Sequence, residues 1–305
     1  MAKLTGETPE VIHQDGTVTP FPRIGPARIQ EQTRFLNMAA RRGTTAVVLE
    51  CMALKPEYQA TSERMIAAHL AVITNARLDH MEEMGRDRHD VTSVLCQVIP
   101  RNGIVVLGEP QLLDVAGPIA EQRQCRIAVA RNAPAGSGLE AAVTISRLVL
   151  SQLDIPPDQR QKAEQYLSRR ASETGSEVAS IEVHGYRAFP MWTVNDIDTF
   201  NILWPKLPER AWMVFNHRAD RPLRTRSFAQ LFGDNADRVS GLLVIGTHSA
   251  VQIFRKTTPP HIPIYRIRRP ATWSELALMA RKAGIEPGAA LVGCGNWKGA
   301  PSDAD

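Results

Sequence analysis

The stretch TAVVLECMALKPEYQ (Thr45–Gln59) opens with a short apolar run that ends at Glu50. A second stretch, LAVITNARLDHMEEMG (Leu70–Gly85), opens in the same way. A continuous apolar run of this length between polar segments is typical of a strand that is buried on both faces, as in a parallel sheet. We therefore predict buried strands over 45–49 and 70–73.

Polar side chains follow both predicted strands. Glu50 comes directly after the first, and Asn75, Asp79 and His80 come after the second. Ligand sites in parallel sheets lie at the carboxyl ends of the strands, so we expect these side chains to lie near one another. Carboxylate, imidazole and amide oxygen are suitable ligands for Mg²⁺ and for the water around it. The alternative for Glu50 is an ordinary strand-end carboxylate in a local salt bridge.

Composition indicates a soluble globular protein. The chain has 305 residues, enough for two domains, with 43% hydrophobic and 22% charged residues. No stretch approaches the ~18 apolar residues of a membrane span, and the first thirty residues contain no signal-peptide pattern. Four scattered cysteines without a CxxC pair argue against a zinc site or a disulfide framework. These features predict a cytoplasmic protein.

The basic residues are mostly arginines. The net charge is +4, and only seven of the 36 basic residues are lysines. Arginine offers a planar fork that matches carboxylate and phosphate, which suits anionic ligands, although codon bias in a GC-rich genome gives the same composition. Nucleic-acid binding is not predicted, because no basic run is interleaved with aromatic residues.

Two alternating series of helices and strands follow each other along the chain. In the second series the helix over 273–283 opens with Thr272 and Glu275 at capping-box spacing and closes at Gly284. We predict two α/β domains with a site between them. The predicted elements of the first series are a helix over 28–42 that Gly43 ends, strands over 104–107 and 126–130, and helices over 139–153 and 158–172. A polar linker over 171–177 precedes the second series, which begins near Tyr186 with strands over 211–215, 241–245, 262–265 and 290–292.

Five sequence blocks in this order resemble the ligase subunit of poly-γ-glutamate synthase, a member of the Mur ligase superfamily of ATP-dependent amide-forming enzymes. Five blocks in the same order are far more specific than any one of them. The resemblance covers nearly the whole chain. The blocks are ECMALKPEYQ (50–59), TNARLDHMEEMG (74–85), VNDIDTFNILW (194–204), FNHRADRPLRTRSFA (215–229) and GCGNWKGA (293–300).

The resemblance implies an α/β fold with two domains. Residues 1–183 would form a P-loop-type parallel-sheet ATPase domain that is truncated at its start, and residues 184–305 a Rossmann-like C-terminal domain. The chain contains no GxxxxGK[ST] run, the glycine-rich loop that cradles phosphates in such enzymes. Two interpretations remain open. Either the start codon is assigned too far downstream and the enzyme is longer, or the chain is a decayed or repurposed relative.

The resemblance also implies roles for particular residues. Glu50 would hold the Mg²⁺ of ATP, and His80 would serve a second ion or the substrate, with Asn75 in the same block. Asn195 and Asp196 would lie near the base and ribose of the nucleotide, although Asn-Asp is also a common turn dipeptide.

Three arginines form a further group in the fourth block. Arg218, Arg221 and Arg224, with Asp220 between them, would position carboxylate or phosphate by bidentate hydrogen bonds. A solvated basic loop is the alternative.

The function implied is amide ligation. ATP would phosphorylate the terminal γ-carboxylate of a glutamate chain, and the amino group of an incoming glutamate would attack the acyl phosphate. The partners implied are glutamate, poly-γ-glutamate and membrane-bound synthase or export subunits. Through these subunits the protein would lie at the inner face of the membrane and take part in the synthesis of capsule or another polymer. A homo-oligomer is left open. The alternatives are an inactive scaffold subunit and a Mur-type ligase with another acceptor, such as a folate or a cell-wall precursor.

Overall fold

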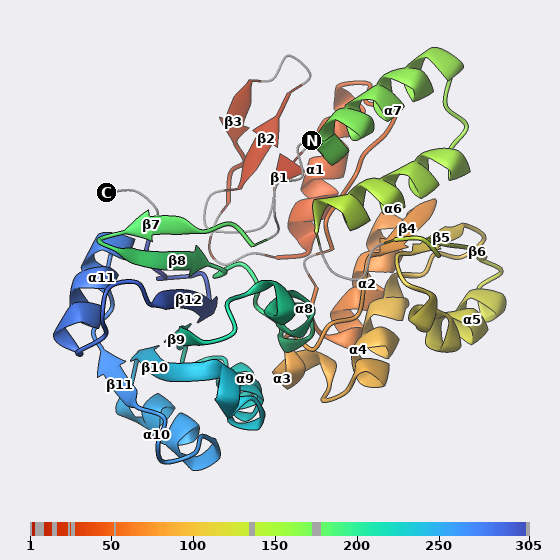
Figure 1. Ribbon diagram of the computed structural model, residues 1–305. Coiled ribbons are helices and arrows are strands. Elements are labelled where there is room, and N and C mark those ends of the chain that lie inside the picture. The colour runs from red at the N-terminus through yellow and green to blue at the C-terminus, as the bar shows by residue number, and fades with distance from the viewer. Residues whose placement is uncertain are drawn as a thin grey trace. The chain divides into compact units, whose positions relative to one another are not determined.

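The computed structural model describes residues 2–3, 9–13, 17–23, 25, 28–51, 53–133, 138–172 and 178–302. The chain divides into two compact units (Figure 1). Unit 1 comprises Met1–Ala76 and His89–Arg131, and unit 2 comprises Arg77–Arg88 and Asn132–Asp305. The short Arg77–Arg88 stretch, which we call the inserted segment, thus belongs to unit 2 although unit 1 surrounds it in sequence. The predicted domain boundary after residue 183 stays a prediction, and most of the predicted 171–177 linker lies outside the described residues.

Unit 1 is built on a three-stranded parallel sheet in the order β4–β5–β6. Gly43, with a φ of 67°, ends the first helix as predicted, in the left-handed region that glycine adopts freely. A small antiparallel sheet, β1–β2–β3, precedes that helix. The elements of unit 1 are β1 (Ala2–Lys3), β2 (Glu10–Ile12), β3 (Val18–Pro20), α1 (Gln30–Arg41), α2 (Pro56–Ile66), β4 (Leu70–Ile73), α4 (Arg88–Leu95), β5 (Ile104–Leu107), α5 (Leu113–Gln122) and β6 (Arg126–Val129), with 3₁₀ turns at Cys96–Val98 and Pro110–Leu112.

The predicted strand over 45–49 is wrong. These residues form no strand, and Val48 exposes 84% of its surface instead of being buried on both faces. A strand needs a neighbour to satisfy its backbone N–H and C=O groups. Among the described residues β4 pairs with β5 alone, so no strand lies beside 45–49. The run has the apolar composition of a strand, but among the described residues it pairs with no other segment.

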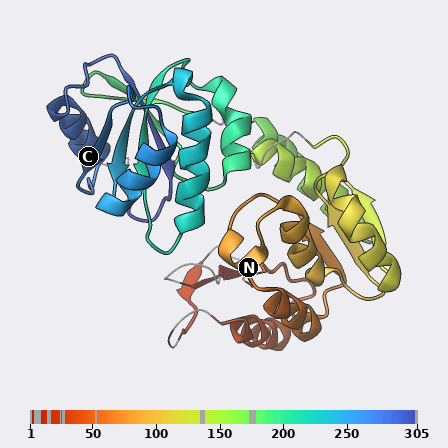
Figure 2. The same cartoon turned by 90° about the horizontal axis from the view of Figure 1, so that it is seen from below.

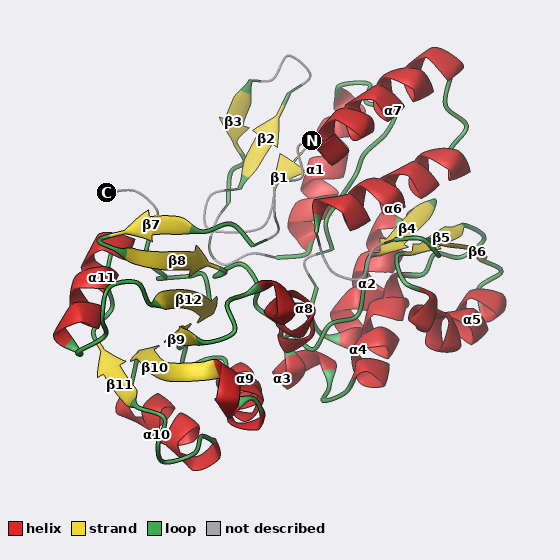
Figure 3. Ribbon diagram, viewed as in Figure 1, coloured by secondary structure: helices red, strands yellow, loops and turns green. Residues whose placement is uncertain are grey.

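Unit 2 contains a six-stranded sheet in the order β11–β10–β9–β12–β8–β7 (Figure 3). All neighbouring strands are parallel except β7, which is antiparallel to β8 at one edge. The elements of unit 2 are α3 (Met81–Met84), α6 (Leu139–Gln152), α7 (Pro157–Ser172), β7 (Ile181–Val183), β8 (Tyr186–Pro190), α8 (Ile197–Leu203), β9 (Ala211–Asn216), α9 (Pro222–Asp234), β10 (Val239–Ile245), α10 (His248–Thr257), β11 (Ile264–Ile267), α11 (Trp273–Lys282) and β12 (Ala290–Gly295), with 3₁₀ turns at Trp204–Lys206 and Ala236–Arg238.

Helices cover both faces of the six-stranded sheet. Successive side chains of a strand point to opposite faces, so Phe215 packs in one core and Val214 in the other. The first core also contains residues of α8, α9 and α10, and the second contains residues of α11. In Figure 2 the dark blue α11 lies on one side of the sheet and the teal helices lie on the other. The arrangement is doubly wound, and ligands of such sheets bind at the carboxyl ends of the strands.

The predicted capping box at the start of α11 is present. The Thr272 hydroxyl accepts a hydrogen bond from the Glu275 N–H at 3.2 Å, and the Glu275 carboxylate accepts one from the Ala271 N–H at 2.8 Å. The predicted α/β class with parallel sheets and a Rossmann-like second part is confirmed. Within the described residues, no helix combines the length and the apolar character needed to cross a membrane.

Candidate functional site

The inserted segment is fastened to unit 2 by polar contacts at both of its ends. The N–H of Leu78 donates to Asp198 at 3.1 Å, and the Arg88 guanidinium donates to the other oxygen of the same carboxylate at 2.9 Å. In between, the Glu82 carboxylate accepts a hydrogen bond from the N–H of Leu223, in the first turn of α9, at 3.1 Å. The first N–H groups of a helix have no partner within the helix, so Glu82 supplies one. These contacts fix Asp79 and His80 beside the sheet of unit 2.

Arg224 joins the inserted segment to the end of β12. Its guanidinium donates to the carboxylate of Asp79, to the side-chain oxygen of Asn296 at 2.5 Å and to the carbonyl of Gly295 at 3.4 Å. The side chain of Arg224 is only 10% exposed. A guanidinium with several charge-assisted hydrogen bonds is held in one orientation. Arg224 is therefore the residue on which the second, fourth and fifth sequence blocks meet.

Two asparagines, Asn216 and Asn296, join the carboxyl ends of β9 and β12 by hydrogen bonds. The Asn216 amide N–H₂ donates to the carbonyl of Asn296 at 2.5 Å and to that of Lys298 at 3.1 Å. In return, the Asn296 amide donates to the carbonyl of Asn216 at 2.7 Å. Gly295 has a φ of 98°, and a Cβ there would lie 2.8 Å from the Asn216 carbonyl oxygen. This close approach requires glycine, which explains the glycine that precedes Asn296.

His80 presents a neutral imidazole at this site. It has a φ of 51° and begins α3, so it occupies a conformation that few non-glycine residues adopt. Burial lowers its pKa from the ordinary value; Asp79 is the main group that opposes this shift, and the Arg221 and Arg224 cations lower the pKa further. Within the described residues, its buried Nδ1 atom has no hydrogen-bond partner. The ring is therefore uncharged at neutral pH with an unused nitrogen, which suits a metal ligand or a substrate contact.

Asp79 is an ionised carboxylate in spite of its partial burial. Burial raises its pKa, but the charge of Arg224 and the hydrogen bonds from Arg224 and from the His80 N–H lower it by more together, so that the pKa lies below the ordinary value. One carboxylate oxygen accepts from Arg224 and the other lies 3.6 Å from His80 Nε2. Asp79 thus neutralises the guanidinium and lies beside the imidazole ring.

The structure gives Asn195 and Asp196 a place at the start of α8. Asp196 caps this helix, because its carboxylate accepts a hydrogen bond from the N–H of Thr199 at 2.7 Å. Burial raises the pKa of the Asp196 carboxyl above the ordinary value, and the hydrogen bonds from Thr199 oppose this shift. The side-chain oxygen of Asn195 is buried and has no hydrogen-bond partner among the described residues. The turn that the sequence offered as the alternative is therefore a helix cap, and the contact of this pair with a nucleotide stays a prediction.

Arg218 and Asp220 form a local pair in the loop after β9. The Arg218 guanidinium donates to both oxygens of Asp220, at 3.0 and 2.5 Å, but the Asp220 side chain is 60% exposed. This pair resembles the solvated basic loop that the sequence left open as an alternative. Of the three arginines predicted to act together, Arg224 is part of the buried network, and Arg221 lies near enough to His80 to lower its pKa.

Glu50 and Asn75 belong to unit 1, whereas His80 belongs to unit 2. Glu50 lies in exposed coil, and its backbone carbonyl accepts a hydrogen bond from the Gln32 side chain at 2.6 Å. Asn75 follows β4, as predicted. The convergence of Glu50 and His80 on one divalent ion stays a prediction.

Sequence reasoning missed two contributors to this site. Asp198 holds both ends of the inserted segment, but in sequence it looks like an ordinary acidic residue in the first turn of a helix. Asn216 looks in sequence like one more polar residue after a strand. Trp297, next to Asn296, is 65% exposed. The signal that could have found them is their position inside the five blocks.

Comparison with solved structures finds that the fold is similar to that of folylpolyglutamate synthases. The chain aligns with the bifunctional folylpolyglutamate synthase/dihydrofolate synthase of Yersinia pestis over 96% of its own length and 79% of that chain, with a TM-score of 0.55 and 13% identity. It aligns with the Mycobacterium tuberculosis folylpolyglutamate synthase over 89% of its length and 71% of that chain, with a TM-score of 0.56 and 11% identity. At these identities the likeness concerns the fold.

Sequence comparison finds similarity to one family in the C-terminal part of the chain. Residues 178–304 match the family model of the poly-gamma-glutamate synthase CapB C-terminal domain. The chain is 38% identical over 105 residues to the capsule biosynthesis protein CapB of Bacillus anthracis, and 31% identical over 105 residues to the PGA synthase CapB of Bacillus subtilis. These matches cover 34% of this chain and 23% and 27% of the two relatives, so the chain spans about a quarter of the length of the curated relatives it matches. The resemblance to the ligase subunit of poly-γ-glutamate synthase is confirmed for the C-terminal part of the chain that these matches cover.

Proposed function

We propose that this protein takes part in the ATP-dependent ligation of glutamate to a γ-glutamyl chain, as an ADP-forming acid–amino-acid ligase. The observation that carries the proposal is the meeting of Asp79, His80 and Arg224 at the carboxyl ends of β9 and β12. Charged groups held by one another at the strand ends of a doubly wound sheet are typical of a ligand site. The blocks that supply them are the same blocks that the family resemblance singled out.

The chemistry requires an activated carboxylate. Transfer of the γ-phosphoryl group of ATP to the terminal γ-carboxylate of the chain gives an acyl phosphate and ADP. The amino group of the incoming glutamate then attacks the acyl carbon, forms the amide bond and releases phosphate. Orientation of both substrates supplies much of the acceleration, on the order of 7–11 kcal/mol in favourable cases.

The residues of unit 2 fit roles in binding and orientation. Arg224, already fixed by Asp79 and Asn296, would orient a carboxylate or phosphate at the strand ends. Arg218 and Arg221 would extend this positive surface along the loop, and Asp220 would hold Arg218 in place. The catalytic group of this proposal therefore comprises His80, Arg218 and Asp220, supported by Arg224.

The free acceptor atoms fit a cation and a nucleotide. The unused, uncharged Nδ1 of His80 is a suitable donor to a divalent ion, and Glu50 would supply the other protein ligand. Mg²⁺ bound there would offset the negative charge that develops on the transferred phosphoryl oxygens. Asn195 and Asp196, together with Asn75, would contact the nucleotide. Membrane-bound synthase or export subunits, and a place at the inner face of the membrane, remain part of the same proposal.

An ADP-release assay tests the proposal. We expect ADP release that depends on glutamate and on a γ-glutamyl acceptor, and that falls about a hundredfold in Arg224→Gln, because one oriented donor is commonly worth that much. An exposed control, Arg210→Gln, keeps the same charge change away from the site and should retain activity. Absence of glutamate-dependent ADP release would remove the proposal.

A further inference from the structure

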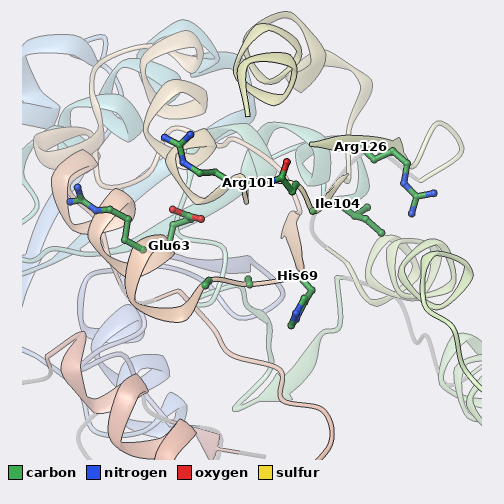
Figure 4. Close-up of a pocket in the computed structure, with 10 residues that line it drawn as sticks. Glu63, His69, Arg101, Ile104 and Arg126 are labelled. Atoms are coloured by element: carbon green, nitrogen blue, oxygen red, sulfur yellow. The ribbon is translucent and has the colours of Figure 1, made fainter. Parts of the chain in front are cut away.

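A hollow in unit 1 offers chemistry that the ligation site does not use. It has a volume of about 600 Å³ and lies at the amino-terminal ends of the parallel strands (Figure 4). Its lining includes His69, just before β4, Ile104, the first residue of β5, and Arg126, the first residue of β6. Ligands of parallel sheets usually bind at the opposite, carboxyl ends. The hollow is therefore a separate feature of the molecule.

The rim of the hollow carries excess positive charge. Arg64, Arg101 and Arg126 line it together with His69, and Glu63 is the only acidic residue in the lining. In the part of the chain that the structure describes, the side chains of Arg101, Arg126 and His69 make no hydrogen bond or ion pair, so their donors face solvent. Guanidinium groups without an internal partner are well suited to bind carboxylate or phosphate. The charge of the hollow thus favours an anionic ligand.

Hydrogen bonds hold the loop that presents Arg101. The Arg123 guanidinium donates to the carbonyls of Gln97 at 3.0 Å and Ile99 at 2.5 Å. The N–H of Asn102 donates to the carbonyl of Arg123 at 3.0 Å. At Gly103 a Cβ would lie 2.7 Å from the carbonyl oxygen of His69, so the turn is packed closely against the strand beside it. Donors on a pre-organised loop bind with a smaller entropy cost than donors on a mobile one.

The basic side chains spread apart instead of converging. In Figure 4, Arg101 and Arg126 extend to opposite sides of the hollow, and His69 leaves it in a third direction. A compact anion such as phosphate needs donors that meet at one point. Charges spread around a rim suit a long ligand whose own negative charges are spaced along it. The small apolar residues Ala67 and Ala68 and the side chain of Ile104 also line the hollow and can contact methylene groups.

We propose that this basic hollow of unit 1 binds the spaced carboxylates of a γ-linked polyglutamate chain. The inference rests on the proposed function for the identity of the polymer. A γ-linked chain combines a carboxylate on every residue with methylene pairs in its backbone, which matches the alternation of basic rim and apolar floor. The hollow would give the protein a preference for long acceptors over single glutamates.

A binding experiment without ATP tests this proposal. A fluorescently labelled γ-linked oligoglutamate is titrated onto the full chain and followed by anisotropy, with the double variant Arg101→Gln/Arg126→Gln. The matched control is Arg28→Gln/Arg41→Gln, which removes the same charge from two exposed positions of unit 1 outside the hollow. We expect binding about tenfold weaker in the first variant and nearly unchanged in the second, with a difference that shrinks at high salt. Equal weakening in both variants would overturn the proposal, since it would reflect net charge alone.

Competition separates the ligand classes. Unlabelled oligoglutamate should displace the probe, whereas inorganic triphosphate at the same total charge should displace it poorly. Displacement by triphosphate as strong as by oligoglutamate would assign the hollow to compact phosphates and overturn the spaced-carboxylate assignment. The outcome is independent of the ligation test. If Arg101→Gln/Arg126→Gln binds oligoglutamate as the wild type does, and glutamate-dependent ADP release is normal, the polymer site is excluded and the proposed function stands. If the variant binds weakly and no glutamate-dependent ADP release is found, the proposed function is excluded and the polymer site stands.

Discussion

Two apolar runs of similar composition adopt different structures in this molecule. The run in β10 lies inside the six-stranded sheet, between β11 and β9, and its Val244 is fully buried in one of the two cores. The run over 45–49 is exposed coil, with Val48 at 84% exposure. The difference is not in the residues, because both runs are rich in β-branched and aliphatic side chains. It lies in the neighbours: β10 has a strand on each side, and 45–49 has none among the described residues.

The comparison shows that a strand is a property of a pair of segments. A buried central strand gains from apolar burial on both faces and from two ladders of hydrogen bonds. A run without a neighbour gains neither, and its propensity alone does not order it. The paired strands of unit 2 therefore form the scaffold of the candidate site.

The largest expected effect is on the aromatic core of unit 2. Phe200 is fully buried, and its ring lies 5.2 Å from the rings of both Trp204 and Phe228. Phe200→Ala should lower the free energy of unfolding by about 3–5 kcal/mol, because it removes apolar contacts and leaves a cavity. Urea unfolding followed by tryptophan fluorescence measures this. The control Tyr166→Ala, at an exposed aromatic residue of α7, should stay within about 0.5 kcal/mol of the wild type. Similar losses in the two variants would contradict the description of this core.

The next effect concerns the ion pair that holds the inserted segment. Arg224→Gln leaves the partly buried Asp79 carboxylate without its main counter-charge and should cost about 2 kcal/mol of stability. Arg218→Gln removes a guanidinium whose partner, Asp220, is mostly exposed, and should cost under about 0.5 kcal/mol. A double-mutant cycle with Asp79→Asn isolates the coupling. A coupling energy near zero would mean that the pair does not form in solution.

A smaller effect is expected in the pH dependence of stability. The pKa of His80 is lowered by burial from the ordinary value of 6.5, so the unfolded chain takes up a proton at a higher pH than the folded chain. The fold should therefore lose stability as the pH falls below about 6.5, down to the lowered pKa. His80→Asn, which tolerates the left-handed backbone, should lose less over this window. The control is His184→Asn, at an exposed histidine with a φ of 49°. Identical pH profiles for the wild type and His80→Asn would contradict the burial of the ring.

Much of the fold could be predicted because its signals are local. Apolar runs predict the strands of unit 2. The residues Thr272, Glu275 and Gly43 predict the ends of helices, because capping depends on neighbours a few residues away. Helix α2 was missed, although Pro56 at its first position is a known start signal. The assignment of the inserted segment to unit 2 had no such signal. It depends on Leu78 meeting Asp198, 120 residues further along the chain.

The candidate site follows the same division. His80 and the arginine cluster could be singled out because their blocks resemble a known family. Which arginine is buried could not, because Arg218 and Arg224 have similar sequence surroundings and differ in what the fold brings to them. Arg224 meets Asn296, 72 residues away, whereas Arg218 meets only its neighbour Asp220. Local sequence identifies the chemical groups, and long-range packing decides which of them act together.

The smallest expected effect tests the exposed run itself. Val48→Ser should change the free energy of unfolding by less than about 0.5 kcal/mol, because the side chain already faces water. Val106→Ser is the matched control in the same unit; this valine is fully buried in β5, and the change should cost about 2 kcal/mol or more, since it removes apolar contacts and buries a hydroxyl. Parallel urea titrations measure both. If Val48→Ser lowered the free energy of unfolding as much as Val106→Ser, the 45–49 run would be packed in solution, and the two apolar runs would not differ in burial.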